Sequence, residues 1–170
     1  MPTDGPVLIC YDGSDSARAA LDTAADLFVG EDAIVACFWQ PFAATAKRFS
    51  VNILELVQNA ESINEREEAL AQQIAEEGAA EARGRGLTAQ ACAIRIDAPL
   101  DEAILLHADE IDATVIVLGA RSRSSVRSLI LGDIANEVAQ RATRAVLLVP
   151  SQPLVERRRD ALRENAQTPL

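Results

Sequence analysis

The stretch PVLICYDGSDSARAALDTAADLFVG occupies residues 6–30 and predicts a buried strand that turns directly into a helix. Residues 7–11 form a continuous apolar run, as in a strand covered on both faces. The turn Asp12-Gly13-Ser14 ends this run, and Ser14, Asp15 or Ser16 can cap the helix that follows. From there to Phe28, apolar residues recur every three or four positions. A strand followed by a helix is the repeating unit of α/β proteins.

The same alternation continues along the chain. Apolar runs predict further strands at residues 33–39, 87–96, 113–118 and 145–149, and helical spacing predicts helices over about 51–83, 100–111 and 132–142. Polar residues are mixed into the strand at 87–96, which indicates a place toward a sheet edge. Because parallel strands need crossover helices, we predict an α/β fold: a single doubly wound domain whose five-stranded, mostly parallel sheet carries helices on both faces.

The length of 170 residues suits one domain, which we assign to residues 1–150. Residues 151–170 form a charged C-terminal tail between Pro153 and Pro169, and little fixed structure is expected there. The chain has no apolar run long enough to cross a bilayer and no basic segment at its start, so we expect a cytoplasmic protein without membrane contact.

Charge and cysteine usage narrow the function. A formal net charge of −10 repels the phosphate backbone of nucleic acid, so DNA or RNA is not an expected partner. The three cysteines, Cys10, Cys37 and Cys92, lie far apart in apolar surroundings, which fits buried reduced thiols rather than a metal site. His107 falls on the apolar face of a predicted helix, away from any nucleophile, and is expected to be structural. No motif of a hydrolytic enzyme is present.

Ligands of parallel sheets bind beyond the carboxyl ends of the strands. This rule selects residues 12–16, 39–42 and 119–133. Gly119 and Gly132 allow backbone N–H groups to approach a phosphate, and the helix that starts near Gly132 presents its positive end. An anion cradle is therefore expected where these turns meet.

Two segments carry a family resemblance. YDGSDSARAALDTAADLF after the first strand and ATVIVLGARSRSSVRSLILGDIANEVAQRATRAVLLVP at residues 113–150 resemble the universal stress protein family, and the likeness in layout covers residues 6–150. The resemblance implies the strand order 3-2-1-4-5, a homodimer and, in some members, bound ATP or ADP with Mg. It places Asp12 and Gly13 near the ribose or metal and Trp39 near the base. The other residues expected to bind the nucleotide are Leu118, Gly119, Arg121, Ser122, Gly132, Asp133 and Ile134.

Two positions depart from the family loop of a glycine, two residues, a glycine, nine residues, then glycine with Ser or Thr. Ser122 replaces the middle glycine, and Asp133 stands where a hydroxyl would donate to phosphate. An ionised carboxylate cannot donate, and at a helix start it satisfies the N–H groups itself. Arg121, Arg123 and Arg127 can offset this charge if they bind phosphate, or they can form a solvated loop.

These departures favour a non-catalytic binding and regulatory module of the stress response in which ATP binding is weakened or lost. The alternative is a functional ATP- or ADP-binding member of the family. A more distant alternative takes DGSDS as a relative of the loop of ATP pyrophosphatases, although the Gly-Gly pair of that loop is absent.

The final apolar strand, Ala145 to Val149, bears on assembly. As an edge strand it exposes unpaired backbone groups, and pairing with the same strand of a second subunit covers them. We therefore expect a homodimer through this strand.

Overall fold

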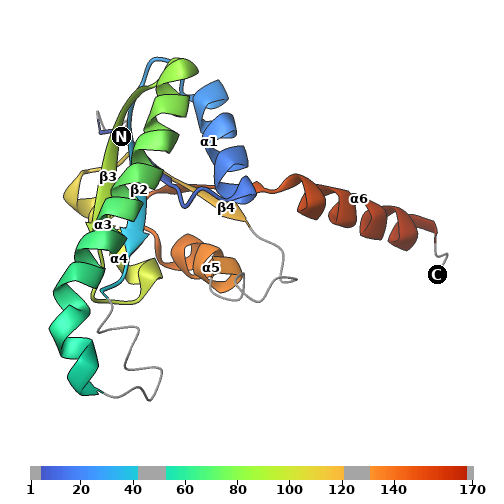
Figure 1. The fold of residues 1–170 in the computed structure, drawn as a ribbon. Helices are drawn as coiled ribbons and strands as arrows, with labels where there is room; N and C mark the ends of the chain where they lie inside the picture. The colour runs from blue at the N-terminus through green and yellow to red at the C-terminus, as the bar shows by residue number, and fades with distance from the viewer. Residues whose placement is uncertain (1–4, 42–52, 121–130, 168–170) are drawn as a thin grey trace.

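The computed structural model describes residues 5–41, 53–120 and 131–167, with strands and helices in alternation (Figure 1). The strands are β1 (Val7–Cys10), β2 (Asp32–Trp39), β3 (Thr88–Arg95), β4 (Val115–Ala120) and β5 (Ala145–Pro150). The helices are α1 (Asp15–Leu27), α3 (Ile53–Gly84), α4 (Leu100–Glu110), α5 (Leu131–Arg141) and α6 (Gln152–Gln167).

All strand pairs of the sheet are parallel, in the order β3-β2-β1-β4-β5. Val7 of β1 pairs with Ala33 of β2 on one side and with Val115 of β4 on the other. The predicted fold class and strand order are therefore confirmed, including the edge position of β3. The chain builds outward from β1 in one direction and then, from β4, in the other, which leaves a crevice at the carboxyl ends of β1 and β4.

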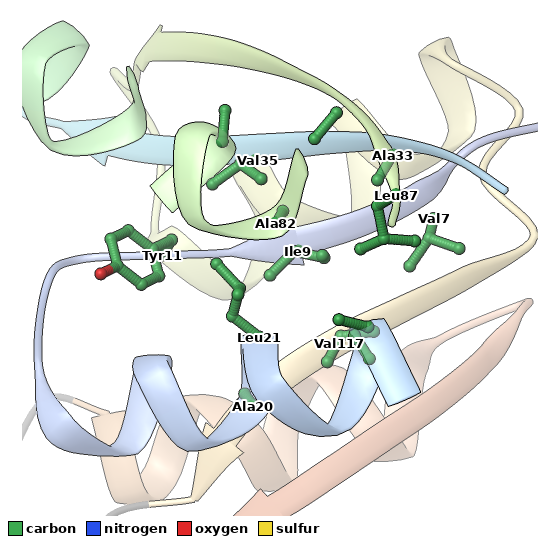
Figure 2. Packing of buried hydrophobic residues seen from close by; sticks show 14 of the residues in the cluster. Val7, Ile9, Tyr11, Ala20, Leu21, Ala33, Val35, Ala82, Leu87 and Val117 are labelled. Atoms are coloured by element: carbon green, nitrogen blue, oxygen red, sulfur yellow. The ribbon is translucent and has the colours of Figure 1, made fainter. Parts of the chain in front are cut away.

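Alternate residues of each buried strand face opposite layers of helices. Val7 and Ile9 of β1 point toward α1 and α3, where they pack with Leu21 and Ala82 (Figure 2). Leu8 between them points to the other face and packs with residues of α4 and α5. This two-sided burial explains why β1 reads as a continuous apolar run rather than an alternating one.

Helix α3 lies close to the sheet because its inner face is made of small residues. A Cβ atom at Gly78 would stand 2.8 Å from Tyr11 Cδ1 and 2.9 Å from Val35 Cγ1, so any larger residue would push the helix outward. Four alanines, each at most 3% exposed, continue the same face: Ala71, Ala75, Ala79 and Ala82.

The two edges of the sheet differ. At β3, the Ala93 N–H donates to Gln72 Oε1 at 3.1 Å, and Arg83 Nη1 donates to the Ala89 carbonyl at 2.8 Å. Side chains of α3 thus occupy backbone groups of this edge. No side chain among the described residues bonds to the backbone of β5. Among the described residues, side chains therefore occupy backbone groups at the β3 edge but not at the β5 edge.

The expectation of little fixed structure after residue 150 is wrong for residues 152–167, which form α6. Pro153 lies in the first turn, where its missing N–H costs no helical hydrogen bond, and Leu, Arg, Glu and Ala are good helix formers. Helix α6 runs away from the rest of the chain (Figure 1). None of the helices in the described ranges combines the length and the apolar character needed to span a membrane.

Candidate functional site

The turn after β1 is built from Asp12, Gly13 and Ser14. Gly13 has a φ of +73°, in the left-handed region that favours glycine. Asp12 Oδ1 accepts a hydrogen bond from the Ser14 N–H at 3.1 Å, and the Ser14 hydroxyl accepts one from the Ala17 N–H at 3.3 Å. Ser14 is therefore the N-cap of α1, and the turn holds Asp12 at the carboxyl end of β1.

Gly119, near the end of β4, lies against the first turn of α1. A Cβ atom at this position would stand 2.9 Å from the Ala17 nitrogen and closer still to the carbonyl group of Ser16. Backbone atoms cannot yield as the end of a side chain can, so α1 or β4 would have to shift. Packing alone therefore requires glycine at position 119, whether or not a phosphate lies nearby.

A small cavity of about 160 Å³ lies beside Gly119. Its apolar walls include Phe38 of β2, Leu118 of β4 and Ile104 of α4, and Asp12 adds a polar edge. Ligand pockets usually measure roughly 300 to 1,000 Å³, so this cavity has room for only part of a ligand.

A larger hollow of about 730 Å³ lies over the carboxyl ends of β2 and β3. Trp39 is buried in its wall, and in the described part of the chain its indole Nε1–H has no hydrogen-bond partner. The two spaces share Asp12, Phe38 and Leu100 and therefore adjoin. The other residues that line the larger hollow are Cys37, Gln40, Glu67, Leu70, Ala71, Ile74, Ile96, Pro99, Asp101 and Ile134.

The described lining of the larger hollow is acidic. Asp12, Glu67 and Asp101 contribute carboxylates, and no lysine or arginine among the described residues lines it. Asp101, in the first turn of α4, is bound by Arg141 at the end of α5, so one carboxylate is neutralised by a contact between two helices. A ligand of high negative charge meets an unfavourable field at this wall.

The thiols beside the site are poor nucleophiles. Burial raises the pKa of Cys37 to about 11, and the nearby Asp12 carboxylate adds to the shift. The same two causes raise the pKa of Cys10 further. Both thiols stay protonated at neutral pH. Within the described ranges, no group of His, Cys, Asp or Glu residues is arranged to hold a metal ion.

His107 packs edge-on against Phe38, with ring centroids 6.3 Å apart and an interplanar angle of 84°. Its Nδ1 lies 3.4 Å from Glu110 Oε2 on the same helix. These contacts fit the structural role expected for this residue.

The structure brings together most of the predicted site residues that it describes. Asp12, Trp39 and Ile134 line the larger hollow, and Leu118 and Gly119 line the smaller cavity. Gly13 forms the turn beside them. Gly132 and Asp133 lie in the first turn of α5, although their side chains are not among those described. Arg121 and Ser122, together with Arg123 and Arg127, lie outside the described residues.

Sequence reasoning missed two walls of the hollow. One comes from α3, which contributes Leu70 and Ile74, and the Leu70 side chain is 51% exposed. The other follows β3, where Ile96 and Pro99 lead into α4. The carboxyl-end rule, applied to the third strand as well, is the signal that points to these two residues.

The comparisons with known proteins agree on one family. The model of the universal stress protein family matches residues 5–150 of the chain. No protein among those with curated descriptions matches it.

Several solved structures share the fold. A universal stress protein in complex with cAMP is 24% identical, with a TM-score of 0.59 over 87% of this chain and 98% of that one. A universal stress protein from Archaeoglobus fulgidus is 22% identical, with a TM-score of 0.63 over 85% of this chain and 98% of that one. Another from Archaeoglobus fulgidus, in complex with dAMP, is 18% identical, with a TM-score of 0.58 over 88% and 99%.

Proposed function

Because the chain belongs to the universal stress protein family, we propose that it is a non-catalytic regulatory module that binds the adenosine part of a nucleotide and disfavours the polyphosphate of ATP. Two similar structures are complexes with cAMP and with dAMP, each of which carries one phosphate. The proposal therefore concerns which part of a nucleotide this chain recognises.

The hollow over β2 and β3 is the observation that carries the proposal. Its volume of about 730 Å³ falls within the range of small-molecule sites. Trp39 and Leu70 offer apolar surface to a purine, and Gln40 offers polar groups to its ring nitrogens. The side chains of the described lining residues leave this space open.

The acidic lining supports the second half of the proposal. Two like charges about 4 Å apart repel by about 4 kcal/mol at an effective dielectric constant of about 20, so each added phosphate charge beside a carboxylate lowers affinity. Asp12 and Glu67 line the hollow together with Asp101, whose charge Arg141 offsets. Asp133, which stands where the family loop has Ser or Thr, lies in the first turn of α5. Gly119, the retained family glycine, is already explained by its packing against α1.

The alternative is an ATP- or ADP-binding protein in which Mg and the arginines at 121, 123 and 127 neutralise the phosphates. Calorimetric titration of the full chain with adenosine, AMP, ATP and ATP with magnesium separates the two. We expect adenosine or AMP to bind at least about tenfold more tightly than either form of ATP. Tighter binding of magnesium ATP favours the alternative. Failure of all four ligands contradicts both and supports a nucleotide-free interaction module.

Non-catalytic behaviour has its own test. The chain should release neither phosphate nor pyrophosphate from ATP, with or without magnesium, over hours of incubation. Pyrophosphate formed in the presence of an adenylate acceptor contradicts the proposal and supports the relationship to ATP pyrophosphatases.

We also propose that two copies pair through β5. Its backbone lacks the side-chain partners that Gln72 and Arg83 give to β3, among the residues described. Pairing with a second β5 satisfies these edge groups. Light scattering should give the mass of a dimer at micromolar concentration, and a monomer at that concentration contradicts the pairing.

A further inference from the structure

Helix α6 leaves the body directly after edge strand β5. A single residue, Ser151, separates the two elements, and the 16-residue helix runs outward (Figure 1). At 1.5 Å per residue, a helix of this length reaches roughly 24 Å. The Leu162 side chain near its far end is 70% exposed. The helix therefore carries exposed apolar surface away from the body of the chain.

One side of α6 carries apolar and basic residues. At 100° per residue, Leu154, Val155 and Leu162 share this side of the helix, and Arg158 falls between Leu154 and Leu162. The exposed Arg157 and Arg159 flank it, whereas Glu156 and Asp160 lie on the opposite side together with Arg163. The segment 151–170 holds four arginines and three acidic residues, in a chain whose net charge is −10. The apolar side of α6 thus suits an apolar groove with an acidic rim.

A groove of this kind lies between α1 and β5. It has a volume of about 430 Å³ and is lined by Ala19 and Thr23 of α1, by residues 147–150 of β5 and by Gln152 at the start of the chain's own α6. The acidic residues Asp15, Asp22 and Asp26 lie on the same side of α1 as Ala19. Asp22, which lines the groove, pairs with Arg85 at 2.8 Å, and Asp15 and Asp26 are exposed.

We propose that α6 of one copy docks in the α1–β5 groove of a second copy, and that the second α6 docks reciprocally in the first. The apolar side of α6 covers Leu147 and its neighbours, and Arg157 and Arg159 face the acidic residues of α1. This inference rests on the proposed pairing of β5 edges, because that pairing brings the partner's groove within reach of the helix. Nothing in it depends on nucleotide.

Cross-linking tests the contact directly. Chains carrying Thr23→Cys are mixed with chains carrying Leu162→Cys, treated with a flexible bismaleimide, and the joined peptides are identified by mass spectrometry. We expect an intermolecular 23–162 cross-link. The matched control replaces Leu162→Cys with Leu106→Cys, an equally suitable leucine on α4 that is 59% exposed, and should give none. Unsubstituted chains report any background from the native cysteines.

The possible results separate the two proposals. A dimer by light scattering without the 23–162 cross-link overturns the docking of α6 and leaves β5 pairing intact. A monomer overturns both. A doubly substituted chain that cross-links within itself at high dilution shows that α6 folds back onto its own groove, which also overturns the inference.

A second variant measures the contribution of the helix. Leu162→Asp places a charge on the docking side and should raise the dimer dissociation constant at least about tenfold, measured by sedimentation equilibrium. Leu106→Asp should leave it unchanged. An unaltered constant in Leu162→Asp contradicts the proposal. Circular dichroism of both variants checks that the fold is retained.

Discussion

Gly119 meets two demands at once, since it belongs to the family's nucleotide loop and also lies against the backbone of Ser16 and Ala17. We expect Gly119→Ala to lower the free energy of unfolding by about 1 to 3 kcal/mol in ligand-free protein, because the added methyl group forces α1 and β4 apart. Urea unfolding measures this loss.

Gly84→Ala is the control. This glycine ends α3, and a Cβ there meets nothing within 4 Å, so the change should be neutral or stabilising by up to about 1 kcal/mol. If Gly119→Ala leaves stability unchanged, the packing explanation fails and the glycine must be explained by its ligand.

The Cys37 thiol, with a pKa raised to about 11 by burial and by Asp12, should resist alkylation. At pH 8, its thiolate fraction is about a hundredfold below that of an unfolded thiol, and the rate should climb as the pH approaches 11. The rate of iodoacetamide labelling is followed at the Cys37 peptide by mass spectrometry, with and without urea. The ratio of the unfolded rate to the native rate measures the difference in thiolate fraction. Equal labelling rates in native and unfolded chains at pH 8 would contradict the raised pKa of Cys37.

The sign of the linkage follows from the same shift. Above about pH 9 the unfolded thiol loses its proton and the folded one keeps it, so the unfolded state binds fewer protons. Stability should therefore fall as the pH rises from about 9 toward 11, and Cys37→Ala should weaken that dependence.

Among the secondary-structure elements, α3 both covers the sheet and bonds to two backbone groups of its β3 edge. Replacing Gln72 with alanine removes the acceptor of the Ala93 N–H. Amide hydrogen exchange at Ala93 should then accelerate by about three- to tenfold, as expected for the loss of one hydrogen bond worth about 1 kcal/mol.

Gln73→Ala is the matched control, because the Gln73 side chain donates to exposed Glu77 on its own helix. Exchange at Ala93 should be unchanged in this variant. Equal exchange rates in the two variants would mean that the Gln72 contact does not protect β3.

Local sequence signals predicted most elements well, since periodicity reports burial directly. They failed at α6, where high charge and flanking prolines suggested disorder, yet Pro153 sits in the one turn that tolerates it. They also ended β4 at Leu118, whereas the strand runs through Gly119 to Ala120. A glycine in a sequence cannot show whether it ends a strand or lets a helix approach one.

At the scale of the molecule, the strand order came from the family resemblance, because periodicity gives elements but not their neighbours. The residues that form the walls of the hollow could not be predicted from the sequence for the same reason. Apolar spacing at Leu70 and Ile74 says that a face is covered, but not whether sheet or open space lies opposite.

The acidic charge of the chain predicts how the affinity for ATP depends on salt. Salt screens charges beyond a Debye length of about 10 Å at 0.1 M, so raising sodium chloride from about 20 mM to about 300 mM should improve the affinity for ATP relative to adenosine. Titration calorimetry at both concentrations measures this ratio. A ratio that falls with salt would mean that basic groups dominate the phosphate site.

The unequal edges of the sheet set a limit on growth. A strand ladder can extend only from a side whose peptide groups are free, and Gln72 and Arg83 already engage peptide groups on one side. If a second copy occupies the β5 edge, each molecule of the pair offers only its β3 edge, where two backbone groups are already engaged, and the addition of further strands is disfavoured.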